Sequence, residues 1–165
     1  TKSIIPIKRK DIEIVSMGFI LDLDTSATWR GPMLSGAIKQ IINSSKWGNL
    51  DFLLIDMPPG TGDSYLTIFD ELPVDHFILI TSSNKLSISD SRRTISMLNK
   101  LEINILGYIE NDILGMSNSK TGNLFFKDNI NNLGIYNFNK NIYDFNPDYN
   151  NPDNDEIISI LEKII

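Results

Sequence analysis

The sequence contains no cysteine and only one histidine, His76, among its 165 residues. Without thiols these residues can form no disulfide, and they can hold no metal ion or iron–sulfur cluster through thiolates of their own. A single histidine cannot build a metal site alone. The sequence therefore excludes the disulfide-stabilised and thiolate-metal classes for this stretch of chain.

Long apolar runs and an excess of positive charge are also missing. No apolar run approaches the roughly 20 residues of a membrane span, and the opening residues TKSIIPIKRK lack the apolar stretch of a signal peptide. The net charge is −6 and the isoelectric point is about 4.7, whereas a nucleic-acid surface is normally basic. We therefore predict a cytoplasmic protein that binds neither nucleic acid nor membrane.

What is present is the composition of an ordinary globular domain. Apolar residues make up 41% and charged residues 22% of the chain, close to globular averages. The apolar patterns predict strands near 12–21, 51–56, 76–81 and 103–110, and helices near 33–44, 64–71, 87–101 and 155–165. This alternation predicts an α/β fold with a mainly parallel sheet and helices on both faces, in a single domain over 1–165.

Several turn and cap signals refine these boundaries. Asp63 is expected to cap the short helix that follows it. Ser87 with Asp90, and Asp153 with Glu156, have the spacing of capping boxes. Residues 117–154 are rich in Asn and Asp, and within them a short helix near 123–132 and a strand near 134–138 are predicted.

The segment DFLLIDMPPGTGD, residues 51–63, is the most informative stretch. An apolar run ends in Asp56, and prolines and glycines then turn the backbone. Ligands of open α/β sheets sit at the carboxyl ends of strands, where an aspartate is placed like the Walker-B acid that holds Mg²⁺. The alternative is an ordinary strand-to-helix turn whose aspartate caps the backbone. The phosphate loop G-x-x-x-x-G-K-[ST] is absent from the sequence.

Four segments in series carry a family resemblance. They are WRGPMLSGA at 29–37, Trp47-Gly48, LLIDMPPGTGD at 53–63 and LGYIEN at 106–111. Together they resemble the Mrp/ApbC branch of the MinD/ParA-type deviant P-loop ATPases, whose members include iron–sulfur cluster carriers. The resemblance covers roughly residues 12–112.

The resemblance implies a role for particular residues. Asp56 matches the acid that binds Mg²⁺, usually through water, and Pro59 and Gly60 lie in the turn that faces the terminal phosphate of ATP. Glycine lets backbone N–H groups approach an anionic oxygen. Asn111 matches the amide that hydrogen-bonds adenine, since its side chain both donates and accepts; the alternative is a strand-end cap. Arg30 is expected either to pair with an acid across a dimer interface or to stay solvated.

The sequence departs from the family pattern in two places. The first strand, the lysine-bearing phosphate loop, its helix and the next strand are absent, so we expect these residues to be the C-terminal portion of a P-loop NTPase-like domain. We expect about 80–100 further residues upstream, the usual size of such units. After Asn111 the family commonly carries a C-x-x-C pair, whereas DILGMSNSKTGNLFF, residues 112–126, has no cysteine.

The resemblance implies an ATP-binding iron–sulfur cluster carrier or assembly ATPase. It would act as a homodimer that uses ATP and Mg²⁺ together with the missing portion, and its partner would be an iron–sulfur apoprotein or an assembly factor. Two alternatives stay open. One is a non-enzymatic binding or assembly module of the same fold, and the other is a MinD-like, ATP-dependent partner switch.

Overall fold

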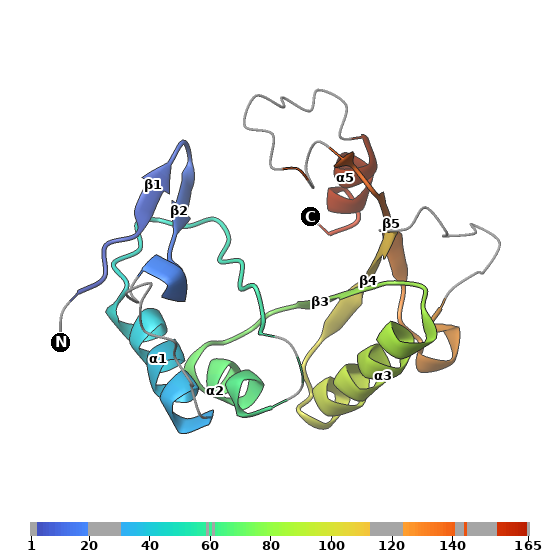
Figure 1. Ribbon diagram of the computed structural model, residues 1–165, viewed down its shortest axis with the longest axis horizontal. Coiled ribbons are helices and arrows are strands. Elements are labelled where there is room, and N and C mark those ends of the chain that lie inside the picture. The colour runs from blue at the N-terminus through green and yellow to red at the C-terminus, as the bar shows by residue number, and fades with distance from the viewer. Residues whose placement is uncertain are drawn as a thin grey trace. The chain divides into compact units, whose positions relative to one another are not determined.

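The structure is a computed structural model that describes residues 3–19, 31–58, 60, 62–112, 124–140, 144 and 155–164. It divides into two compact units, Thr1–Pro73 and Val74–Ile165 (Figure 1). Predictions on Arg30, Pro59 and the Asp153 cap lie outside the described residues. The expectation of one domain over 1–165 stays a prediction. No helix within the described ranges is long and apolar enough to cross a membrane.

The first unit begins with a hairpin. Strands β1 (Ile7–Arg9) and β2 (Ile12–Ile14) pair antiparallel, and a short 3₁₀ helix, η1 (Met17–Phe19), follows. The predicted strand 12–21 is therefore confirmed only at its start. The backbone turns at Ser16, whose hydroxyl accepts from the Gly18 N–H at 3.2 Å and whose carbonyl accepts from the Phe19 N–H at 3.1 Å. These local bonds replace the ladder that a longer strand would need.

Two helices pack together in the same unit. They are α1 (Gly31–Ser44) and α2 (Asp63–Glu71), which confirms the helices predicted near 33–44 and 64–71. Glu71 joins them, because its carboxylate lies 2.8 Å from Lys39 Nζ and accepts from Asn43 Nδ2 at 2.8 Å. One turn earlier, Thr67 Oγ1 lies 3.0 Å from Ser35 Oγ.

The predicted strand over 51–56 is not formed. Residues 52–58 lie outside any helix or strand, and the side chains of Phe52 and Leu54 are 68% and 89% exposed. A strand exists only where a neighbour completes its hydrogen-bond ladder, and no described residue pairs with this segment. The apolar run thus has the composition of a buried strand but has no partner strand in the described part of the chain.

Two predicted helix caps also differ. Gly62, not Asp63, is the N-cap of α2, and Asp63 is its first helical residue, where a carboxylate still interacts favourably with the helix dipole. Helix α3 (Lys85–Lys100) begins before the predicted Ser87–Asp90 box, because the Asn84 side chain accepts from the Ser87 N–H at 2.9 Å. Asn is an N-cap as favourable as Ser, so the earlier cap sets the start of the helix.

The second unit is built on a parallel sheet. Its strands are β3 (Phe77–Thr81), β4 (Ile105–Asp112) and β5 (Asn132–Asn137), in the spatial order β3-β4-β5. They confirm the strands predicted near 76–81, 103–110 and 134–138, and with them the α/β class. The helix predicted near 123–132 is reduced to a 3₁₀ turn, η2 (Phe126–Asp128), which ends at Asn129 in the left-handed region, with φ 57°.

Helices cover both faces of this sheet. Helix α3 lies on the face of Leu79 and Thr81, where Ser91 Oγ donates to Thr81 Oγ1 at 2.9 Å. Helix α5 (Asp155–Leu161) packs on β5, so closely that a Cβ on Gly134 would lie 2.5 Å from Ile160 Cγ1. Gly134 pairs with Ile109, which pairs with Ile80, and Ile80 points away from the face of Leu79. The two helices therefore flank the sheet (Figure 1).

Candidate functional site

Asp56 and the turn after it form the part of the candidate site that lies in the first unit. The Asp56 side chain is exposed, as an ion-facing carboxylate must be, since an unpaired carboxylate in the core would be too costly to keep ionised. Gly60 has φ +96°, a conformation that only glycine adopts without strain. Pro59 and Thr61 lie outside the described residues.

The backbone of this turn has free space around its two described glycines. A Cβ on Gly60 or on Gly62 would meet no atom within 4 Å. Gly62 caps α2 without any side-chain hydrogen bond, and its carbonyl accepts from the Tyr65 N–H at 3.0 Å. Backbone N–H groups at the start of a helix carry partial positive charge. The turn can therefore present its backbone to an anionic oxygen.

Asn111 lies in the second unit, near the carboxyl end of β4. Its Cα pairs with Tyr136 of β5, and its side chain is half-buried. Glu110 and Asp112, the residues on either side, are both buried, so Asn111 points to the opposite face of the sheet. Because Asp56 and Gly60 belong to the first unit, the three residues remain a predicted site and not an observed one.

Two residues that the sequence reasoning missed lie in the same strand as Asn111, on the opposite face of the sheet. Glu110 is 2% exposed, and its Oε1 has no hydrogen-bond partner among the described residues. Tyr108 is fully buried, and its hydroxyl accepts from the Leu124 N–H at 3.0 Å. Burial raises the pKa of the Tyr108 phenol. The only sequence signal was a charged residue within an apolar strand, which also fits an exposed strand end.

The possible metal ligands at the candidate site suit Mg²⁺ bound together with a nucleotide better than a metal ion held by protein side chains alone. Mg²⁺ keeps several waters and is usually bound by one or two carboxylates together with phosphates. Asp56 offers such an exposed carboxylate. The described residues include no group of three or more His, Asp or Glu side chains that could hold a metal ion by themselves. The exposed carboxylate of Asp56 therefore fits Mg²⁺ as part of a phosphate complex.

The parallel sheet flanked by helices is an α/β arrangement similar to the fold of solved MinD structures. The solved structure of the septum site-determining protein MinD from Pyrococcus horikoshii, complexed with Mg-ADP, has a TM-score of 0.57 to this chain at 18% identity. The match covers 82% of this chain and 56% of that one. The cell division ATPase MinD of Pyrococcus furiosus gives a TM-score of 0.56 at 16% identity, over 82% and 58% of the two chains. These likenesses confirm the fold.

Residues 1–137 match the ParA family described as NUBPL iron-transfer P-loop NTPase, and the chain belongs to that family. The chain is 44% identical over 127 residues to the iron-sulfur cluster carrier protein of Rickettsia conorii, covering 77% of this chain and 40% of that protein. It is 42% identical over 110 residues to the protein of that name from Pseudomonas fragi, covering 67% and 38%. The resemblance to the Mrp/ApbC branch is thus confirmed. The chain spans about two fifths of the length of these curated relatives.

Proposed function

We propose that this chain is part of an ATP-dependent iron–sulfur cluster carrier. The observation that carries the proposal is the family match over residues 1–137, together with relatives named as carriers at 42–44% identity. The proposed protein is cytoplasmic and works as a homodimer that binds ATP between its subunits. The cluster is its cargo, and because the 165 residues contain no cysteine, thiolate ligands for the cluster must come from outside them.

The proposed roles of the site residues follow from their chemistry. Asp56 would hold Mg²⁺ through water, and a bound Mg²⁺ neutralises charge on the phosphate oxygens. The Gly60 N–H would approach the terminal phosphate from the open side of the turn, with Pro59 fixing the backbone before it. Asn111 would select adenine by donating one hydrogen bond and accepting another.

The first unit also contains elements through which a change in the bound nucleotide would alter the surface presented to a partner protein. The turn at 57–62 leads directly into α2, and α2 is tied to α1 through Glu71 with Lys39 and through Thr67 with Ser35. A displacement of Gly60 toward a phosphate would therefore move α2, and α1 with it. Order changes in such turns are a common switching device in nucleotide hydrolases.

Cluster transfer tests the proposal. The full-length protein, loaded anaerobically with a cluster, is mixed with an apo-enzyme whose activity requires one, with and without Mg-ATP. We expect activation of the acceptor that depends on ATP and is lost in Asp56→Ala. A protein that binds no cluster under these conditions, or that transfers it equally well without nucleotide and with Asp56→Ala, would overturn the proposal.

The alternative is a non-enzymatic binding or assembly module of the same fold, in which the 165 residues would provide a surface for a partner and no part of a nucleotide site. In that case Mg-ATP would change neither the partner affinity nor the oligomeric state of the full-length protein. Sedimentation with and without Mg-ATP separates this module from the carrier ATPase.

A further inference from the structure

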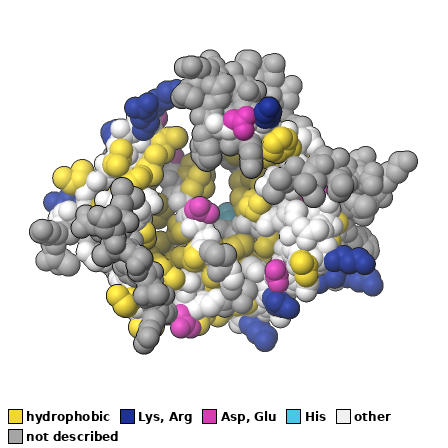
Figure 2. Space-filling model, viewed as in Figure 1, with side chains coloured by type: hydrophobic (Ala, Val, Ile, Leu, Met, Phe, Trp, Pro, Cys, Tyr) yellow, Lys and Arg dark blue, Asp and Glu magenta, His cyan; other side chains and the backbone are white. Residues whose placement is uncertain are grey.

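Helix α3 has a charge opposite to that of the whole protein. It contains four basic residues and one acidic residue, so it carries a net charge of +3, whereas the chain carries −6. Dark blue side chains gather over this helix in Figure 2. The basic residues form what we call the basic face: Lys85, Arg92, Arg93 and Lys100. A concentrated positive area on an acidic protein attracts and orients acidic partners.

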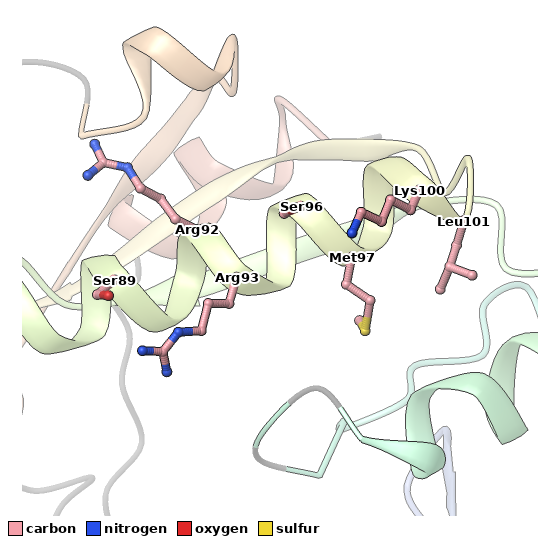
Figure 3. Close-up of a pocket in the computed structure, with 7 residues that line it drawn as sticks. All are labelled: Ser89, Arg92, Arg93, Ser96, Met97, Lys100 and Leu101. Atoms are coloured by element: carbon pink, nitrogen blue, oxygen red, sulfur yellow. The ribbon is translucent and has the colours of Figure 1, made fainter.

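The basic face lies opposite the buried side of α3. Ser91, Ile95 and Leu98 are buried against the sheet, and at 3.6 residues per turn the four basic residues fall on the other side of the helix. Arg92 and Arg93 extend to opposite sides of the helix, and Ser96 and Lys100 follow along it toward Leu101 (Figure 3). A shallow depression of about 600 Å³ lies along it.

An apolar edge runs beside the basic face. Leu86 is 80% exposed and Leu101 is 37% exposed, and Met97 lines the same depression. Met97 and Leu101 point to the same side of the helix in Figure 3. Exposed apolar side chains therefore accompany the cations near both ends of α3, which is roughly 24 Å long for its 16 residues.

The arginines are held by ion pairs that exchange easily. Arg93 lies 3.0 Å from Asp90, and both side chains are more than 70% exposed. Arg92 lies 3.4 Å from Asp128, and its own side chain is 50% exposed. Exposed pairs contribute little to stability, so a partner's carboxylates can replace them. Lys85 and Lys100 have no ion pair with any other described residue.

We propose that the basic face of α3 docks an acidic amphipathic helix of a partner protein. Carboxylates of that helix pair with Arg92, Arg93 and the two lysines, and its apolar side chains cover Leu86, Met97 and Leu101. The charge pattern favours this choice, because a helix with a net charge of +3 attracts an acidic partner that the net charge of −6 on the whole chain repels. This inference goes beyond the proposed function, which uses other elements.

Fluorescence anisotropy tests the docking. The probe is a synthetic, labelled helical peptide of about 16 residues, with Glu on one face and Leu on the other. It is titrated with the full-length protein at low and at physiological ionic strength. We expect saturable binding that weakens with salt. The double substitution Arg92→Glu and Arg93→Glu should weaken it at least about tenfold, the loss expected when close charge pairs turn repulsive.

Matched controls separate docking from general charge effects. Arg9→Glu with Lys10→Glu reverses two adjacent exposed charges in the β1–β2 turn, and it should leave peptide binding within about twofold. Arg92→Lys with Arg93→Lys should retain binding, and Met97→Ser should weaken it without changing its salt dependence. Circular dichroism confirms that each variant folds.

Three results would overturn the proposal. The first is a loss of affinity in the β1–β2 variant as large as that in the α3 variant, which would indicate an effect of net charge alone. The second is binding of phosphatidylserine vesicles through Arg92 and Arg93 without binding of the peptide, which would make this a lipid surface. The third is a loss of self-association in the α3 variant, which would make the occupant a second copy of the chain.

Discussion

At the scale of single residues, the role proposed for Asp56 is the easiest to test. Its carboxylate is exposed at the end of an apolar segment, so removing it should not disturb a core. We expect Asp56→Ala, in a protein that includes the phosphate loop, to lower Mg²⁺-dependent ATP hydrolysis by at least about a hundredfold, since a metal ion supplies several kcal/mol of charge stabilisation. Steady-state hydrolysis measures this. Asp51→Ala, an exposed acid five residues earlier, is the control, and unchanged turnover in Asp56→Ala would eliminate the assignment.

Glu71 gives a prediction about pH at the same scale. Hydrogen bonds from Lys39 and then from Asn43 lower the pKa of its carboxyl below the ordinary value of 4.5, and the same pair raises the pKa of Lys39. A carboxyl with a depressed pKa stabilises the fold above its ordinary pKa, and this stability is lost as pH falls through the folded-state value. The Lys39 side chain is 51% exposed and that of Glu71 is 21% exposed, so solvent weakens the pair and the effect is small.

We therefore expect Glu71→Gln to lower the melting temperature slightly at pH 7. The difference from the unsubstituted protein should begin to shrink as the pH falls below the ordinary value of 4.5, and it should disappear once the pH has fallen through the lowered pKa at which the folded-state carboxyl is protonated. Thermal unfolding followed by circular dichroism at several pH values checks this. Glu102→Gln, at an exposed position in the turn after α3, serves as the control. A difference that persists in acid would mean that Glu71 acts through packing and not through its charge.

At the scale of elements, the close approach of α5 to β5 can be tested at Gly134. A Cβ there would lie 2.5 Å from Ile160 Cγ1, close to the branch point of a buried side chain. We expect Gly134→Ala to cost about 1–3 kcal/mol through overpacking. Gly36→Ala in α1 is the matched control, because its Cβ would meet nothing within 4 Å, and it should stabilise the helix by about 0.5–1 kcal/mol. Urea unfolding measures both, and equal effects at the two positions would contradict the packing argument.

The helices and strands also show which parts of the fold could be predicted from the sequence. Helices α1, α2 and α3 followed from apolar residues at helical spacing, because a helix satisfies its backbone within its own segment. The segment 51–56 has an equally clear pattern and did not become a strand, because a strand depends on a neighbour that a local pattern cannot supply. The start of α3 was misplaced because Asn84 and Ser87 are both good caps. Glu110 was missed because nothing local marks a carboxylate as buried.

At the scale of the whole molecule, two apolar features have no partner among the residues that the structure describes. Strand β3 is at the edge of the described parallel sheet, and its Ile80 side chain is 58% exposed. The segment 52–54 exposes Phe52, Leu53 and Leu54. Exposed apolar edges invite association with other chains. We expect the isolated polypeptide 1–165 to aggregate or to recruit another chain, which size-exclusion chromatography with light scattering would reveal. A monodisperse monomer would contradict this.

The groups present in residues 1–165 also determine how tightly this polypeptide alone should bind Mg-ATP. Asp56 offers one carboxylate and Asn111 one amide, and no lysine-bearing phosphate loop occurs in the sequence to neutralise the triphosphate. Most of the attraction for the triphosphate comes from such a loop, through its backbone N–H groups and lysine. We therefore expect isothermal titration of this polypeptide with Mg-ATP to show binding much weaker than micromolar, and no difference between the unsubstituted chain and Asp56→Ala.

One-to-one micromolar binding that Asp56→Ala abolishes would refute this expectation. It would also mean that the described elements form a complete nucleotide site by a route that the family pattern does not use.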